Sequence, residues 1–266
     1  MNEVITAKLY GGRVTVDLNP RNHRYHVSDT TAAPDGVTTL CNGTIPKFQL
    51  IDWAGRTCAH AVRDGCLRIW EETGMFPEQS AFLSICAEAE TAHNNARDAA
   101  GDKGSITHDL IEKHILGEPY EIPSDPLVKA GFNAFLKWKE QTDIEIIEVE
   151  RLVYSEKYFY CGKTDFLGRR RDGKLVIGDF KTGNSAGYEG EWYQLAAYAV
   201  AVEEETGDII EDGLIVHLDK KTGRFKEYPV ILDDDMNHAW KAAVVHYKNL
   251  KRVRNMVKEM KKDGNR

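Results

Sequence analysis

The sequence has no apolar run long enough to cross a membrane, because nothing in it approaches the roughly 18 consecutive apolar residues that a spanning helix needs. Its first residues, MNEVITAKLYGG, lack the apolar core of a secretory signal. They also contain an acid and no arginine, unlike a transit peptide. These absences predict a cytoplasmic protein that does not associate with a membrane.

Cysteine is scarce. The chain has five cysteines, and no two of them form a CxxC pair: Cys41, Cys58, Cys66, Cys86 and Cys161. The odd number and wide spacing exclude a disulfide framework and a zinc knuckle. We expect most of them to be small buried residues in a reducing compartment.

Positive charge is in short supply as well. The chain carries 35 lysines and arginines against 42 aspartates and glutamates, a formal net charge of −7 at pH 7. Broad, nonspecific wrapping of nucleic acid needs a basic surface, so this balance argues against it. A polyanionic substrate would therefore have to be held by local basic groups or by metal ions.

What the sequence does contain is a helical first half followed by strands. Strand patterns at 7–18 and 23–27 precede helical stretches at 46–70, 78–99, 105–117 and 125–142, the last two with Ser105 and Asp125 as N-caps. Strands follow at 144–156, 158–170 and 174–182, then a helix at 189–205, strands at 213–219 and 225–232, and a helix from 233 onward. This order predicts an α/β fold of the mixed α+β kind, a mixed sheet flanked by helices with an added N-terminal helical region.

Two carboxylates are brought together by the turn between the second and third of these strands. Asp172-Gly173 is a strong turn signal, and Asp165 and Asp179 each lie seven residues from Asp172. A three-residue loop centred on Asp172 would place the two carboxylates directly opposite, about 5 Å apart on one face. A two-residue loop would put them on opposite faces, so the loop length decides the chemistry.

Lysines accompany both carboxylates. Alternation along a strand puts Lys181 on the face of Asp179 and Lys163 on that of Asp165, with Phe180 turned into the core. Two like charges at this distance repel by roughly 3 kcal/mol, which a divalent cation would remove. The alternative is an exposed hairpin whose charges form ordinary surface ion pairs.

Three motifs follow one another along the chain: GKTDFLG, LVIGDFKTG and YQLAAYA. Together and in this order they resemble the PD-(D/E)XK nuclease superfamily in its RecB-like exonuclease branch. The helix GSITHDLIE resembles the upstream histidine motif of that branch. The stretch 36–54 is similar to the N-terminal part of phage-type and mitochondrial genome maintenance exonucleases. The resemblance implies a restriction-endonuclease-like core at 105–232, preceded by strands and helices at 1–104 in the same compact unit. A basic helix at 233–266 would pack on this core.

The resemblance assigns roles to individual residues. It makes Asp165 and Asp179 metal ligands, with His108 and the backbone carbonyl of Phe180 completing the metal shell. Lys181 corresponds to the catalytic lysine. The remaining catalytic residues are the glutamine and tyrosine of the QxxxY motif, Gln194 and Tyr198, which position substrate and lysine.

The sequence departs from the family pattern at one position and lacks one feature of some relatives. Thr164 stands where the superfamily's name has proline. No cysteine follows Cys161, so the iron–sulfur cluster of some relatives is excluded. The implied cofactor is Mg²⁺ or Mn²⁺.

The resemblance implies a metal-dependent DNA exonuclease that acts from a free end and prefers single strands, in recombination, repair or replication. It would work in the cytoplasm, or in the host cytoplasm if a phage encodes the chain. A recombination or replication protein would be its partner. A structure- or sequence-specific endonuclease and an inactive DNA-end-binding module are the alternatives.

Several features stay open. Glu112 could support the metal site or be solvated, and Glu150 could face the site. The segment 240–266 has nine lysines and arginines against two acids, so it could follow a DNA backbone or be a solvated amphipathic helix. Its apolar positions Val244, Tyr247, Leu250 and Val253 would then pack inward. The aromatic residues Phe48, Trp53 and Trp70 are expected in the core.

Overall fold

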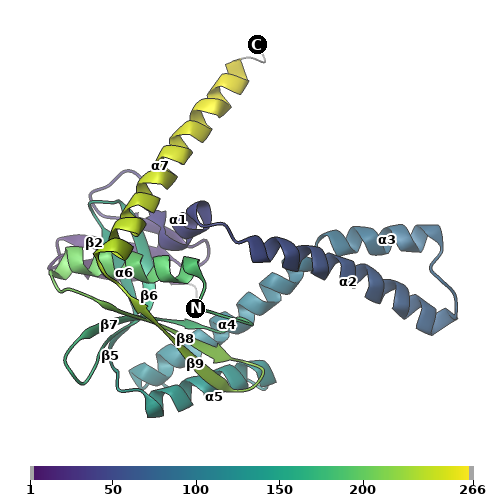
Figure 1. Cartoon of the computed structure of the whole chain (residues 1–266), viewed down its shortest axis with the longest axis horizontal. Helices are drawn as coiled ribbons and strands as arrows, with labels where there is room; N and C mark the ends of the chain where they lie inside the picture. Colours follow the sequence, from purple (N-terminus) through teal and green to yellow (C-terminus); the bar gives the residue numbers. More distant parts are fainter. Residues whose placement is uncertain (1–2, 264–266) are drawn as a thin grey trace. The chain divides into compact units, whose positions relative to one another are not determined.

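The computed structural model describes residues 3–263, and these form two compact units. The larger unit consists of residues up to 45 together with those from 107 onward, and the smaller unit consists of residues 46–106. Figure 1 follows the chain through both units. The motifs GKTDFLG, LVIGDFKTG and YQLAAYA and the residue His108 all lie in the larger unit.

The larger unit is built from two sheets. Its elements are β1 (Ile5–Leu9), β2 (Val14–Asn19), β3 (Arg24–Val27), β4 (Asp35–Gly36), α1 (Val37–Thr44), α5 (Pro126–Gln141), β5 (Glu145–Ser155), β6 (Tyr160–Arg169), β7 (Leu175–Lys181), α6 (Glu189–Thr206), β8 (Asp212–Asp219), β9 (Arg224–Ile231) and α7 (Asp234–Asp263). Strands β1–β3 form an antiparallel sheet. The main sheet has the order β4-β6-β7-β8-β9, with β5 paired to β6. It is mixed, because β7 and β8 run parallel across the crossover helix α6, whereas β5–β6, β6–β7 and β8–β9 are antiparallel.

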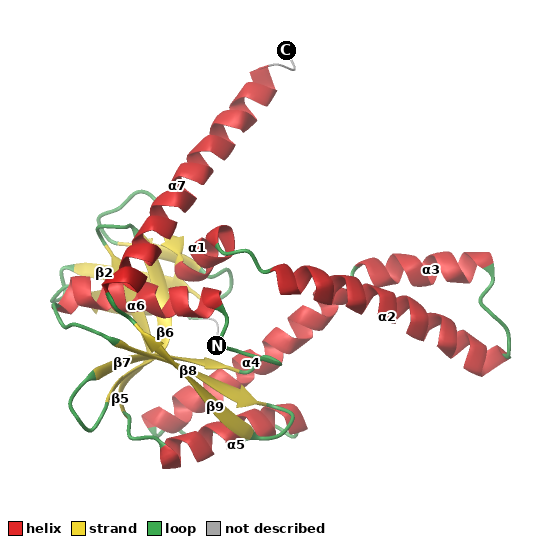
Figure 2. Ribbon diagram, in the orientation of Figure 1, coloured by secondary structure: helices red, strands yellow, loops and turns green. Residues whose placement is uncertain are grey.

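Helices cover both faces of the main sheet, as Figure 2 shows. On one face, α1, α6 and α7 pack over Leu167 and Ile177. On the other, α5 and the end of α4 (Ala92–Leu116) pack over Phe166, Val176 and Phe180. The alternation along β7 therefore sends neighbouring residues into two different cores. The predicted mixed α/β architecture is confirmed.

A glycine allows the close packing beneath the β6–β7 hairpin. A Cβ on Gly178 would lie 1.8 Å from the ring of Phe166, an impossible contact. The Phe166 ring can therefore lie flat across β7, where it packs against Phe180 and Trp138. These aromatic contacts pack the hairpin against the hydrophobic core on one face of the sheet.

The first 45 residues belong to the larger unit, which differs from the expected grouping of 1–104 as one region. Strand β4 pairs in parallel with β6, Asp35 opposite Tyr160. Val37 and Leu40 of α1 are buried in the core beneath α6 and α7. The chain enters the sheet, leaves it for the helices of the smaller unit, and returns. Local sequence patterns carry no signal for such an excursion.

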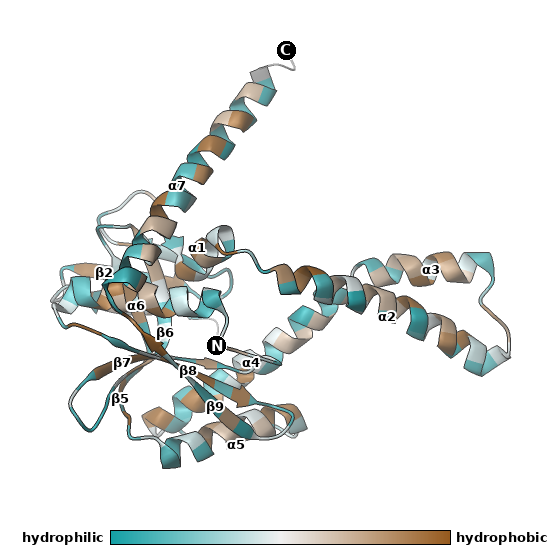
Figure 3. Cartoon of the chain, viewed as in Figure 1, coloured by the Kyte–Doolittle hydropathy of each residue, from teal (hydrophilic) through white to brown (hydrophobic). Residues whose placement is uncertain are grey.

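The smaller unit contains α2 (Phe48–Thr73), α3 (Gln79–Glu90) and the first part of α4. The expected helix start at Ser105 is wrong, because α4 is continuous from Ala92 to Leu116. The expected burial of aromatics is wrong as well: Phe48 is 71% exposed and Trp70 is 55% exposed. Figure 3 shows apolar positions scattered along α2 and α3. A two- or three-helix layer this small has little interior, so apolar residues remain at its surface.

The C-terminal helix packs through its first half only. Val244 is buried, whereas Tyr247 and Leu250 are half-buried. Val253 is 53% exposed, so the expected inward stripe ends before it. The side chains of residues 251–262 are all exposed. Residues 264–266 of the expected basic helix lie outside the described residues.

Two smaller expectations concern the cysteines and membrane-spanning helices. Cys41 and Cys161 are buried, whereas Cys58, Cys66 and Cys86 are partly exposed, so burial of the cysteines is only partial. None of the helices in residues 3–263 combines the length and apolar character that a membrane span requires.

Candidate active site

The β6–β7 hairpin has the three-residue loop that the carboxylate geometry requires. The ladder runs from Phe166 opposite Gly178 to Arg169 opposite Leu175, and the Arg170 amide donates to the Lys174 carbonyl. Residues 171–173 form the loop, and Gly173 takes the positive φ of +91° that favours glycine. Extending this register by one residue beyond the pair Phe166 and Gly178 puts Asp165 opposite Asp179. The alternative with a two-residue loop is thereby excluded.

The two strands separate where the carboxylates lie. Beyond the pair Phe166 and Gly178, the amide of Phe180 donates to Oδ2 of Asp165 at 2.6 Å. The Thr164 hydroxyl donates to the Gly178 carbonyl at 3.0 Å. A side-chain carboxylate and a hydroxyl thus stand between the strands, which opens a polar gap in the sheet. Thr164, the departure from the superfamily's proline, has a structural role at the edge of this gap.

A second group of contacts fixes Asp179 and Lys181. The Lys181 Nζ lies 2.6 Å from Oδ2 of Asp179 and donates to Oε1 of Gln194 at 3.1 Å. The Gln194 amide nitrogen lies 3.1 Å from Oδ1 of Asp179 and 2.7 Å from the hydroxyl oxygen of Tyr198. Gln194 and Tyr198 are one turn apart on α6, so they share a face. All four expected members of this group lie together.

His108 reaches the site from α4. Its Nδ1 lies 3.5 Å from Oδ1 of Asp165, and its ring meets the edge of Phe180 with centroids 6.5 Å apart. The predicted proximity of His108 and Asp165 is therefore present in the structure. Because α4 is remote in sequence from the hairpin, only the packing of α4 and α5 under the sheet brings them together.

Glu150 is the residue that the sequence left open. Val149 pairs with Phe166 and Arg151 with Thr164, so Glu150 stands opposite Asp165 from the other side of β6. Its φ of +52° lies in the left-handed region, which a non-glycine residue occupies at a cost. Its carboxylate also forms an ion pair with Lys163. The pairing register of β5 with β6 could have placed Glu150 at the site. That register cannot be counted along the sequence, because a β-bulge near Ile147 shifts it by one residue.

One set of side chains fits a hard divalent cation. Among the described residues, His108, Glu150 and Asp165 each offer a ligand atom, and these atoms lie within 4.8 Å of one another. Two carboxylates and an imidazole suit a metal that keeps several waters. Asp179 lies beside this group, with its oxygens engaged by Lys181 and Gln194. The ligand roles of Asp179 and of the Phe180 carbonyl stay predictions.

The electrostatics of the site shift the pKa values of its two aspartates in opposite directions. Burial opposes ionisation of Asp165, but the nearby His108 and Lys181 outweigh it and lower the pKa of that carboxyl. Burial raises the pKa of Asp179 to about 6, and the charge of Asp165 adds to the effect. Burial also opposes the charge on Lys181, yet Asp179 and Asp165 raise the pKa of its amine. Asp165 is therefore the more readily ionised of the two aspartates, and Asp179 keeps its proton to a higher pH.

The decisive comparison concerns the part of the chain that carries this hairpin. Residues 127–263, just over half of the 266-residue chain, match the family described as the PD-(D/E)XK nuclease superfamily. The chain belongs to this superfamily. The matched range includes every member of the constellation except His108. As a PD-(D/E)XK nuclease, it belongs to a group of enzymes that use divalent metal ions.

Other comparisons with this PD-(D/E)XK nuclease are more distant. No curated protein matches its sequence. LHK-Exo, an alkaline exonuclease from Laribacter hongkongensis, is 14% identical with a TM-score of 0.35, covering 60% of this chain and 84% of its own. Its complex with dAMP gives 13% identity and a TM-score of 0.37 over the same shares. The structure of SSO0001 gives 16% identity and a TM-score of 0.32, covering 71% of this chain and 72% of its own. The assignment to the superfamily rests on the family match.

Proposed function

We propose that this PD-(D/E)XK nuclease is a metal-dependent DNA exonuclease of the RecB-like branch, acting from a free end and preferring single strands. The observation that carries the proposal is the meeting of Asp165, Asp179 and Lys181 with His108 and Glu150 at one gap in the sheet. The metal would be Mg²⁺ or Mn²⁺. The biological setting we propose is recombination, repair or replication in a cytoplasm, with a recombination or replication protein as partner.

His108, Glu150 and Asp165 would hold the ion, with Asp179 and the Phe180 carbonyl as further ligands. A bound ion supplies two things to phosphodiester hydrolysis: an activated water and neutralisation of charge on a phosphoryl oxygen.

The chain's own residues orient the reacting groups. Asp179 and Gln194 hold the amine of Lys181 in place, and its side chain remains 25% exposed. It can therefore both keep a fixed position and reach a phosphoryl oxygen or the attacking water. Tyr198 lies against the Gln194 amide nitrogen, which keeps the Gln194 amide from rotating.

An exonuclease should need a DNA end. We expect the wild-type protein to degrade linear single-stranded DNA in Mg²⁺ and to leave a covalently closed circular single strand of the same sequence untouched. Linear substrates labelled at one end, with each end blocked in turn, would give the polarity. Duplex DNA under the same conditions measures the strand preference.

The outcomes separate the alternatives. Cleavage of the closed circle would identify an endonuclease of the same superfamily. Tight binding to ends with no ion-dependent turnover, with EDTA and Mg²⁺ reactions indistinguishable, would instead indicate an inactive end-binding module.

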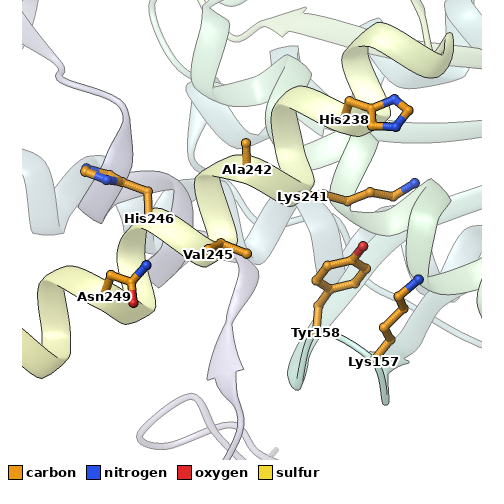
Figure 4. Close-up of a pocket in the computed structure, with 8 residues that line it drawn as sticks. All are labelled: Lys157, Tyr158, His238, Lys241, Ala242, Val245, His246 and Asn249. Atoms are coloured by element: carbon orange, nitrogen blue, oxygen red, sulfur yellow. The ribbon is translucent and has the colours of Figure 1, made fainter.

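We also propose that DNA contacts a basic cavity beside α7 (Figure 4). The cavity measures about 690 Å³ and lies between α7 and the turn that joins β5 to β6. Among the described residues that line it none is acidic, and they include Lys157, Tyr158, His238, Lys241 and His246. In a chain with net charge −7, such a place is suited to the phosphates of a nucleic-acid strand.

The β6 strand connects this cavity to the site. Tyr160 begins β6 just after the cavity's turn, and Asp165 lies five residues further on. At about 3.3 Å per residue, these two positions are about 17 Å apart. That span corresponds to about five nucleotides at the 3.4 Å rise of a duplex strand, and fewer in an extended single strand.

The double variant Lys157→Ala, Lys241→Ala should weaken binding of long oligonucleotides and leave binding of very short ones unchanged. Two lost phosphate contacts should reduce the slope of log affinity against log salt by roughly 1.4 for single strands. Fluorescence anisotropy with labelled oligonucleotides of increasing length, in Ca²⁺, measures both. Lys258→Ala, Lys261→Ala removes the same charge from the exposed part of α7 and is the matched control. Equal losses in the two double variants would mean a diffuse electrostatic effect and no specific contact at the cavity.

A further inference from the structure

Lys163 is a cation at the site that the expected catalytic set does not include. It lies on β6, two residues before Asp165, and its amine forms an ion pair with Oε2 of Glu150. Glu150 is at the same time one of the three residues whose ligand atoms lie within 4.8 Å of one another. A lysine amine and a divalent ion therefore both require the same carboxylate.

The position of Glu150 leaves the carboxylate little freedom. Its backbone is in the left-handed region, at φ +52°, and its side chain is only 11% exposed. A buried carboxylate on a constrained backbone does not swing easily between two sites. The exposed fraction of the Lys163 side chain is larger, 30%, and its long aliphatic stem can move the amine toward solvent. Of the two partners, the lysine is the one able to withdraw.

The second lysine of the site shows the contrast. The amine of Lys181 has two partners, Asp179 and the carbonyl oxygen of Gln194. Its contact with Gln194 does not depend on an acid, so Lys181 can stay in place when an ion arrives. For Lys163, the ion pair that the structure shows within the described residues is the one to Glu150, and its other charge interaction is also with an acid, Glu112, whose pKa burial raises and the charge of Lys163 lowers.

We propose that Lys163 is a positioning residue that neutralises Glu150 in the metal-free protein and releases it when a divalent ion binds to His108, Glu150 and Asp165. The inference rests on the proposed function, because it requires an ion at this place. It has two consequences. Lys163 stabilises the metal-free fold, where the carboxylates would otherwise repel one another, and it lowers the affinity for the ion, which must displace it.

The test is ion binding by the protein without DNA. We expect Lys163→Met to bind Mn²⁺ and Ca²⁺ roughly tenfold more tightly in calorimetry, the effect of removing a close competing charge. Its unfolding temperature in EDTA should be several degrees lower than that of the wild type. Saturating ion should raise the unfolding temperature of the variant by more than it raises that of the wild type. Lys163→Arg keeps the charge and should behave like the wild type. Lys174→Met removes an exposed lysine from the same hairpin and should change neither quantity.

Further outcomes decide the inference. In a Glu150→Gln background, Lys163→Met should no longer increase the affinity, because the competition concerns that carboxylate. Should Lys163→Met fail to fold, Lys163→Gln gives the same comparison. Ion affinity that is unchanged or lower in the neutral variants overturns the inference, while wild-type ion binding and cleavage would leave the proposed function standing. A wild-type protein that neither binds the ion nor cleaves DNA would overturn both.

Discussion

Replacing Asp179 by asparagine is expected to reduce cleavage of linear DNA in Mg²⁺ by about a thousandfold or more. The substitution keeps the size of the side chain and an oxygen near Gln194, but it removes the carboxylate that pairs with Lys181 at 2.6 Å. Loss of that charge removes both a proposed ion ligand and the anion that holds the proposed catalytic amine, effects worth several kcal/mol in a transition state. The measurement is single-turnover cleavage of an end-labelled single strand.

Two controls make this result specific. Circular dichroism and thermal unfolding should show a folded variant, because the two cores on either side of the sheet do not depend on Asp179. Asp172→Asn removes a carboxylate from the tip of the same hairpin, away from the site, and should leave the rate close to that of the wild type. Undiminished cleavage by the Asp179 variant would exclude the assigned site.

Replacing Lys181 by methionine is expected to lower the cleavage rate by about two to four orders of magnitude while preserving DNA binding. The aliphatic part of the side chain is retained, and only the amine that Asp179 and Gln194 hold is lost. A group that acts on the attacking water or on the developing phosphoryl charge contributes to the transition state more than to binding. The rate constant should therefore fall while the dissociation constant for DNA, measured in Ca²⁺, changes little.

The comparison variant is again Lys174→Met, whose native side chain is 55% exposed and lies 4.0 Å from Glu211. A similar loss of rate in both variants would mean that the hairpin needs positive charge in general. A variant of Lys181 whose DNA affinity falls as much as its rate would place the lysine in substrate binding and remove it from the chemical step.

Much of the site could be predicted because its geometry is local. The turn signal at Asp172-Gly173 allowed a loop of two or three residues, and with three residues period-two alternation carries Asp165 and Asp179 to opposite positions. The spacing of four between Gln194 and Tyr198 works in the same way on α6. Over a few residues, a strand or helix has only one way to present its side chains.

Other features could not be obtained in this way. The φ of +52° at Glu150 and the bulge near Ile147 change which residues of β5 face the gap. The sequence also did not predict that residues 46–106 form a separate helical unit, or that Phe48 and Trp70 are exposed. Patterns of apolar residues show that a helix has a preferred face, but not whether another element covers it.

By itself, the sequence determined the mixed α/β order and the shared face of the glutamine–tyrosine pair of α6, because each depends on neighbours close in the chain. It left two loop lengths for the hairpin, and only one of them opposes the two carboxylates. The tertiary structure alone decided that His108 and Glu150 lie beside Asp165, that Lys163 pairs with Glu150, and that the first 45 residues belong to the larger unit. These are contacts between segments distant in the chain, and they form only when both faces of the sheet are packed.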